Sequence, residues 1–198
     1  MNKILILFAH PLFEKSRIHN ALSRVVGVSE NIAFHDLYET YPDFNIRIEE
    51  EKELLLHYDI IIWQHPFYWY SIPPLLKQWI DVVLEFGWAY GPGGEALKGK
   101  IIFNAVSAGG REEAYSDEGR NRFTVRQFLA PLEQTALLCN MNYIAPYVIH
   151  GTHLLTDDHI SDYASEYQKL LEILQRIPTN ELKNFSGNYL NELVTKNN

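Results

Sequence analysis

The sequence predicts an α/β protein built on a doubly wound parallel sheet. Continuous apolar runs alternate with helical patterns along the chain, and parallel strands need such crossover helices between them. The run from Ile60 to Trp63 has no polar alternation, which is typical of a strand buried on both faces. With 198 residues, 46% of them hydrophobic and 21% charged, the chain suits one globular domain that buries roughly 70% of its unfolded surface.

The first half of the chain alternates strand and helix. Apolar runs predict strands at Lys3–Phe8 and Ile32–Asp36. Ser16 is a favourable N-cap residue, so we expect a helix at Arg17–Val26 between these two strands. A second helix is predicted at Ile46–His57, ahead of the third strand.

The second half continues this alternation. The predicted strand Asp59–Gln64 leads through an aromatic segment to the predicted helix Pro73–Phe86. Two prolines suit the first turn of that helix, because the N–H that proline lacks would be unsatisfied there anyway. The remaining predicted elements are strands at Lys100–Val106 and Tyr143–Ile149 and helices at Asn121–Leu138 and Ile160–Gln175.

The end of the chain differs in composition from the rest. Pro178 ends the last clear helical pattern, and the residues beyond it are polar and rich in asparagine. We therefore expect one domain over residues 1–176. A polar tail over residues 177–198 is expected to be either loose or a partner-docking arm.

Composition and charge exclude several classes of protein. The formal net charge of −8 argues against a non-specific nucleic-acid binder. Cys139 is the only cysteine, so neither an internal disulfide nor a cysteine-rich metal site can form. The opening MNKILILFAH is too short for a signal peptide, and no stretch approaches the roughly 18 apolar residues of a membrane span. We expect a cytoplasmic protein.

Four aromatic residues follow the third predicted strand. Phe67, Tyr68, Trp69 and Tyr70 come directly after Gln64-His65-Pro66, at the carboxyl end of that strand. Open α/β sheets bind their ligands at this edge. Flat side chains in such a loop favour a flat ligand.

The loop after the first predicted strand offers an anion site. The strand ends beside His10, and Ser16 caps a helix whose free N–H groups and dipole attract anions. Each residue alone is better explained as a strand-end histidine, a cap or a solvated arginine, but their place after the first strand of a parallel sheet favours a phosphate held by His10, Ser16 and Arg17. The dinucleotide fingerprint G-x-G-x-x-G is absent from this loop.

A pair of glycines follows the fourth predicted strand. Ser107 and Ala108 precede Gly109 and Gly110, and paired glycines let a backbone approach a ligand closely and bond to it through N–H groups. Taken alone, the pair is also compatible with a plain turn. This loop and the aromatic loop would line the same edge of the sheet.

Other reactive side chains carry weaker signals. Tyr115 lies in a charged segment, where a surface tyrosine is the simpler interpretation. His150 and His153 have a spacing found in metal sites, but no further cysteine or carboxylate completes a ligand set. We therefore expect no metal.

Several segments occur together in one order along the chain. They are His10-Pro11 with Ser16, the block QHPFYWYSIPPLLKQWID, the segment GWAYGPGGEALKGK and Ser107–Gly110. This set resembles the flavodoxin-like NAD(P)H:quinone oxidoreductase family. Tyr41-Pro42-Asp43-Phe44 is similar to the branch that contains the ancillary oxidoreductases of glutathione-gated potassium efflux systems and related general stress proteins.

The resemblance implies a homodimeric flavoprotein with a five-stranded parallel sheet in the order 2-1-3-4-5. The residues that it places around the flavin phosphate are His10, Ser16, Arg17, Ile18 and His19. Those that it places beside the flavin ring are Phe67, Tyr68, Trp69 and Tyr70. Those at the polar edge of the ring are Ser107, Ala108, Gly109 and Gly110.

The resemblance also implies a reaction. Tyr115 falls where the family carries a tyrosine near flavin O2, and Asn121 stands where those enzymes place a histidine. The implied flavin is FMN, with FAD as the alternative, because no long carboxy-terminal extension is present to cover an adenine. NADH or NADPH would reduce it, and a quinone or similar electrophilic acceptor would then take two electrons in a ping-pong cycle.

Two other functions stay open. The first is a flavin-binding regulatory subunit of a glutathione-gated potassium efflux transporter, held at the inner face of the membrane through that partner. The second is a flavodoxin-type electron carrier, which is disfavoured because residues 73–94 resemble quinone reductases.

Overall fold

One parallel sheet forms the centre of the computed structural model, which describes residues 1–27 and 30–196. Its strands are β1 (Ile4–Phe8), β2 (Ile32–Asp36), β3 (Ile60–Pro66), β4 (Ile101–Ser107), β5 (Asn142–Tyr143) and β6 (Tyr147–Ile149). The order is β2-β1-β3-β4-β5, and β6 also pairs with β4. The predicted flavodoxin-like sheet is confirmed, with a sixth strand added.

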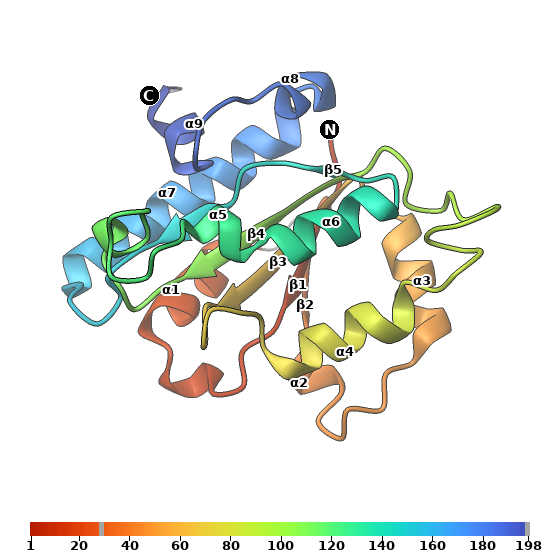
Figure 1. The fold of residues 1–198 in the computed structure, drawn as a ribbon, viewed down its shortest axis with the longest axis horizontal. Coiled ribbons are helices and arrows are strands. Elements are labelled where there is room, and N and C mark those ends of the chain that lie inside the picture. The colour runs from red at the N-terminus through yellow and green to blue at the C-terminus, as the bar shows by residue number, and fades with distance from the viewer. Residues whose placement is uncertain (28–29, 197–198) are drawn as a thin grey trace.

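Helices cover both faces of this sheet. They are α1 (Arg17–Val25), α2 (Leu37–Thr40), α3 (Ile48–Leu56), α4 (Pro74–Val83), α5 (Val125–Phe128), α6 (Ala130–Leu138), α7 (Asp157–Arg176), α8 (Thr179–Lys183) and α9 (Asn191–Lys196), with 3-10 turns η1 (Phe13–Lys15) and η2 (Glu112–Ala114). Helices α1, α7, α8 and α9 pack on one face, and α3, α4 and α6 pack on the other (Figure 1). Within the described ranges, no helix is long and apolar enough to cross a membrane.

The central strands divide their side chains between two cores. In β1, Leu5 and Leu7 face the core under α4 and α6, while Ile4 and Ile6 face the core under α1 and α7. All residues of β1 and β3 are buried. Burial on both faces explains why these segments are continuous apolar runs.

The last predicted strand, Tyr143–Ile149, is divided in two. Strand β5 ends at Tyr143, and β6 begins at Tyr147. Pro146 lies between them and has no N–H to donate to the sheet. The segment is apolar throughout, so its pattern did not reveal the interruption.

The predicted helix Asn121–Leu138 begins later and is also divided. Thr124 caps α5 by accepting a hydrogen bond from the Gln127 N–H, and the Gln127 side chain accepts one from the Thr124 N–H. Pro131 then lies in the first turn of α6 and cannot continue a preceding helix. The residues from Asn121 to Phe123 therefore belong to the loop that follows η2.

The segment beyond residue 176 packs on the sheet domain. Leu182 and Leu190 are fully buried in the same core as α7. The Leu190 N–H donates to the carbonyl oxygen of Pro146 (2.9 Å), and the Asn191 side chain accepts from the Val148 N–H (3.0 Å). Up to residue 196, the expected tail is thus bound to the domain rather than loose. Its role as a partner-docking arm stays a prediction.

We expect Leu190→Ala to lower the free energy of unfolding by about 2–5 kcal/mol, because truncating a buried leucine removes apolar contact and leaves a cavity. Leu154 is 60% exposed, so Leu154→Ala is the matched control, with an expected change of about 0.5 kcal/mol or less. Urea unfolding of both variants measures the difference. Equal, small losses would show that the terminal segment does not contribute to the core.

Candidate functional site

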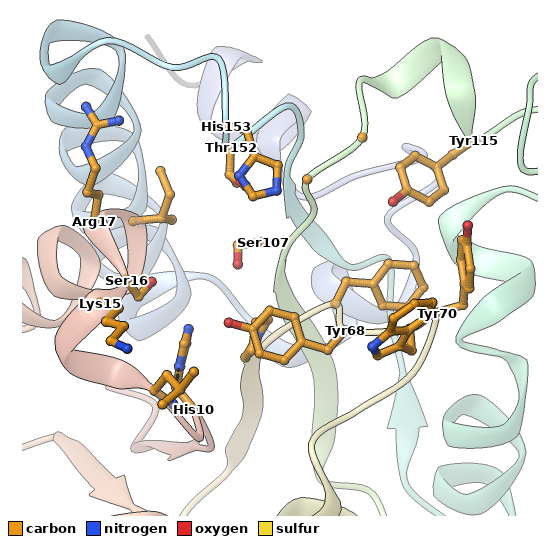
Figure 2. Close-up of a pocket in the computed structure, with 17 residues that line it drawn as sticks. His10, Lys15, Ser16, Arg17, Tyr68, Tyr70, Ser107, Tyr115, Thr152 and His153 are labelled. Carbon is orange, nitrogen blue, oxygen red and sulfur yellow. Dashed lines mark hydrogen bonds between the residues drawn. The ribbon is translucent and has the colours of Figure 1, made fainter.

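A pocket of about 650 Å³ opens at the carboxyl ends of β1, β3, β4 and β6 (Figure 2). Four loops supply its lining, one after each of these strands. The lining residues are His10, Leu12, Lys15, Ser16, Arg17, Ile18, Pro66, Phe67, Tyr68, Trp69, Tyr70, Ser107, Gly109, Gly110, Tyr115, Thr152 and His153. The position agrees with the general rule that open α/β sheets bind ligands at this edge.

The start of α1 forms one end of this pocket, which we call the anion-binding end because its free N–H groups suit an anion. The Ser16 hydroxyl accepts a hydrogen bond from the His19 backbone N–H (3.1 Å). The backbone N–H groups of Arg17 and Ile18 have no hydrogen-bond partner among the described residues. Lys15 adds a cationic side chain to the lining. Free N–H groups at a helix N-terminus suit a phosphate.

The side chain of Arg17 is engaged elsewhere. Its guanidinium donates to the carbonyl oxygen of Leu155 (3.0 Å) and to the carboxylate of Asp157 (2.6 Å). Arg17 therefore ties the start of α1 to the loop that carries Thr152 and His153. Its contribution to the anion-binding end is its backbone N–H.

His10 is a neutral hydrogen-bond donor at the pocket wall. Burial lowers the pKa of His10 to about 4, an effect that the carboxylate of Glu14 opposes. The Leu12 N–H donates to His10 Nδ1 (3.1 Å), so the proton of the neutral ring is on Nε2. The ring therefore offers an N–H without adding a positive charge.

The buried histidines predict that stability falls in acid. Burial also lowers the pKa of His65 to about 4, against about 6.5 for an ordinary histidine. Since the folded pKa values are lowered, the unfolded chain binds more protons between about pH 6.5 and about pH 4. The free energy of unfolding should be highest above this window and fall as the pH drops through it.

Urea unfolding across this pH range measures the slope. We expect His10→Gln to reduce the slope, because one depressed histidine is removed. Leu154 is 60% exposed and does not titrate, so Leu154→Ala is the control and should keep the slope of the parent protein. The same slope in all three proteins would contradict the assignment.

The aromatic loop after β3 is held in an unusual conformation. Trp69 and Tyr70 have φ angles of 50° and 62°, in the left-handed region that bulky residues rarely adopt. Tyr70 stacks on Phe128 with ring centroids 5.0 Å apart, and its hydroxyl donates to the Asn121 side chain (3.3 Å). Trp69 is 92% exposed. Backbone strain of this kind is concentrated at ligand sites.

The loop after β4 brings two glycines close to other parts of the lining. A Cβ on Gly109 would lie 2.7 Å from Nε2 of His153, and a Cβ on Gly110 would lie 3.0 Å from the ring of Tyr115. The Gly109 N–H has no hydrogen-bond partner among the described residues, whereas the backbone of Gly110 bonds to the Tyr115 hydroxyl. Ala108 is fully buried behind them, and its N–H donates to the carbonyl oxygen of Ile149 (2.8 Å).

Tyr115 lies inside the pocket and not on the open surface. Its ring packs near Phe67 (centroids 6.0 Å apart) and His150 (5.5 Å), and 8% of the residue is exposed. Burial raises the pKa of Tyr115, and a nearby tyrosine adds to the effect, so the hydroxyl keeps its proton. The Asn121 side chain accepts from Tyr70 instead of lining the pocket. Of the two residues expected to take part in the reaction, Tyr115 therefore lines the pocket and Asn121 does not.

The pocket gathers most of the predicted site residues. His19, Ala108 and Asn121 are not among the lining residues: His19 and Ala108 are fully buried, and Asn121 lies in a partly exposed loop. The lining residues that the sequence reasoning missed are Leu12, Lys15, Pro66, Thr152 and His153. The position of Thr152 and His153 just after the last strand was the available signal, because that end of a parallel strand faces the ligand.

Comparison with known proteins decides the family. A family model for the flavodoxin-like fold matches residues 2–171. The chain belongs to the flavodoxin-like family.

Three relatives are similar to this chain over nearly their full length. The glutathione-regulated potassium-efflux system ancillary protein KefF of Salmonella typhimurium is 41% identical over 174 residues, covering 88% of this chain and 98% of KefF. The general stress protein 14 of Treponema denticola, solved in complex with FMN, has a TM-score of 0.83 and 39% identity over 87% of this chain and 99% of its own. An NADPH-quinone reductase from P. pentosaceus has a TM-score of 0.77 and 31% identity, covering 84% and 96%.

Proposed function

We propose that the protein is an FMN-dependent oxidoreductase that transfers two electrons from NADH or NADPH to a quinone or a similar electrophile. The observation that carries this proposal is the convergence of a helix N-terminus, an aromatic loop and a glycine pair on one pocket. The FMN complex of general stress protein 14 and the NADPH-quinone reductase of P. pentosaceus support it. FAD and the choice between NADH and NADPH stay open alternatives.

The donor set fits FMN. The N–H groups of Arg17 and Ile18, with the Lys15 ammonium, would hold the phosphate. Gly109 would donate to the polar edge of the ring system, and Gly110 would hold the Tyr115 hydroxyl beside it. The pocket volume of about 650 Å³ lies within the roughly 300–1,000 Å³ usual for cofactor sites.

Two sets of lining groups would have separate roles in this reaction, one at the polar edge of the ring and one beside the ring. When bound, FMN supplies the redox chemistry, since it can accept a hydride from a nicotinamide and return two electrons to an acceptor. The Tyr115 hydroxyl and the Gly109 N–H would stabilise negative charge on the ring edge. The aromatic side chains of Phe67 and Tyr68 would orient the ring and exclude water.

Steady-state kinetics tests the proposal. Protein stripped of cofactor should be inactive, and added FMN should restore quinone reduction by NADH or NADPH. Varying both substrates should give the parallel lines of a ping-pong mechanism. Protein that takes up no flavin, or that turns over no quinone when loaded, would overturn the proposal.

We expect Tyr115→Phe to slow flavin reduction by NADH or NADPH about 5- to 30-fold without releasing FMN. A typical hydrogen bond is worth about 0.5–1.5 kcal/mol and one to a charged group about 1.5–3 kcal/mol, so we expect the loss of one donor at the ring edge to cost about 1–2 kcal/mol. Stopped-flow absorbance measures the rate. Tyr163→Phe, on α7 and outside the lining, is the control and should reduce at the parent rate. Equal rates for the two variants would remove Tyr115 from the chemistry.

A second function is supported by the similarity to KefF. That relative is named as an ancillary protein of a potassium-efflux system, and 98% of its length is matched. We infer that this protein can act as an ancillary subunit on the cytoplasmic face of such a transporter. Copurification with a glutathione-regulated potassium-efflux transporter tests this, and a Tyr115→Phe variant that still binds would separate docking from catalysis. Absence of binding by loaded and cofactor-free protein would dismiss it.

Two exposed aromatic side chains, one before and one after α4, support a homodimer. Trp69 is 92% exposed and Phe86 is 67% exposed, and large exposed apolar groups usually mark contact surfaces. Sedimentation at micromolar concentration should show a dimer. A monomer under these conditions would contradict this part of the proposal.

A further inference from the structure

Behind the pocket wall, three fully buried polar side chains form a hydrogen-bonded chain that ends on Ser107. They are His19 of α1, Gln64 of β3 and Tyr167 of α7. The Tyr167 hydroxyl lies 2.8 Å from Gln64 Oε1, Gln64 Nε2 lies 3.3 Å from His19 Nδ1, and His19 Nε2 lies 2.8 Å from Ser107 Oγ. The chain thus connects the helical layer to a lining residue of the pocket.

The direction of these hydrogen bonds follows from the first member of the chain. Burial raises the pKa of Tyr167, so its hydroxyl keeps its proton and donates to the Gln64 carbonyl oxygen. The Gln64 amide then donates to Nδ1 of His19. Burial, together with two neighbouring histidines, holds the pKa of His19 well below its usual range, so the ring is neutral and carries its proton on Nε2. That N–H donates to Ser107 Oγ.

We propose that His19 is a positioning residue that fixes the Ser107 hydroxyl as a donor toward the pocket. Ser107 Oγ accepts the hydrogen bond from His19 Nε2–H, so its own O–H is available to an acceptor oxygen or nitrogen of the cofactor. A hydroxyl without such a support could donate or accept with equal ease. Support from buried neighbours keeps a binding group in one geometry. The identity of the ligand rests on the proposed function, whereas the direction of the hydrogen bonds does not.

The His19 tautomer can be measured without any cofactor. Nitrogen-15 NMR of histidine-labelled, flavin-free protein distinguishes a protonated from an unprotonated ring nitrogen, and the His19→Gln variant assigns the signal. We expect the neutral tautomer with the proton on Nε2. A proton on Nδ1 would reverse every donor in the chain and overturn the proposal, whether or not FMN binds.

FMN affinity, measured by quenching of flavin fluorescence, tests the consequence. We expect His19→Leu and Ser107→Ala each to weaken binding about tenfold, and the double variant to lose no more than Ser107→Ala alone. His19→Gln keeps a side-chain N–H and should stay within about threefold of the parent. Unchanged affinity in His19→Leu, or losses that multiply in the double variant, would contradict the positioning role.

Thermal unfolding of the flavin-free variants separates folding from binding. If His19→Leu does not fold, Ser107→Thr against Ser107→Ala decides, since threonine keeps the hydroxyl and alanine does not. Equal binding by these two variants would count against a donor at this position. A parent protein that binds no FMN would defeat the proposed function, and the tautomer measurement would then decide this inference alone.

Discussion

Ser16→Asp is expected to weaken FMN binding about 100-fold or more while leaving the fold intact. The Ser16 side chain caps α1 beside the free N–H groups of the anion-binding end. A carboxylate here would lie close to the ligand phosphate. Two like charges about 4–6 Å apart repel by about 3–4 kcal/mol near a protein surface, and each 1.4 kcal/mol is a factor of ten.

Ser16→Asn is the matched control for this charge. Asparagine and aspartate are both favourable N-cap residues, so both variants keep the cap of α1. Asparagine adds similar bulk without charge. We expect Ser16→Asn to bind FMN within about tenfold of the parent and both flavin-free variants to unfold at similar temperatures. Equal affinity of the two variants would place the phosphate elsewhere.

Glu51→Ala is expected to lower the free energy of unfolding by about 3–5 kcal/mol. Glu51 is 2% exposed, and its carboxylate accepts hydrogen bonds from the Tyr41 hydroxyl and the Trp79 indole N–H (2.7 Å) and lies 2.8 Å from His35 Nε2. Burial raises the pKa of Glu51, but the interactions with His35, Tyr41 and Trp79 together outweigh burial, so the pKa is lowered. Removing the carboxylate leaves buried donors without an acceptor.

The control is the preceding residue on the same helix. Glu50 has a 65% exposed side chain and pairs with the exposed Arg47 (2.6 Å). Surface pairs contribute about 0–1 kcal/mol, so Glu50→Ala should change stability by no more than that. Urea unfolding compares the two. Similar effects would show that the Glu51 cluster does not stabilise α3 against the sheet.

The strands of the central sheet were predictable because their burial leaves a continuous apolar signature. Ile60–Trp63 is the clearest case, since both faces of β3 are covered. The division of the last strand into β5 and β6 was not predictable in the same way. Pro146 lies between the two strands, yet the run of apolar residues continues through it. The terminal helices α8 and α9 were missed because they bury isolated leucines, such as Leu182 in α8 and Leu193 in α9, in a polar segment.

Loop position at the carboxyl edge of the sheet predicted most of the pocket. Sequence could not show which way each side chain points. Arg17 is the first residue of α1 at the anion-binding end, but its side chain bonds to Asp157. Asn121 follows Tyr115 along the chain, but its side chain bonds to Tyr70. His19 follows Ser16 in the helix, yet its ring reaches Ser107 through the buried side of the wall. These outcomes depend on contacts between segments far apart in the chain.

The central claim is tested most directly by anaerobic titration of the FMN-loaded protein with NADPH and with NADH. Our account predicts that an equimolar amount of at least one nicotinamide bleaches the visible flavin absorption, and that a quinone then restores it. Protein that binds no flavin, or bound FMN that stays oxidised with both nicotinamides, would contradict the account.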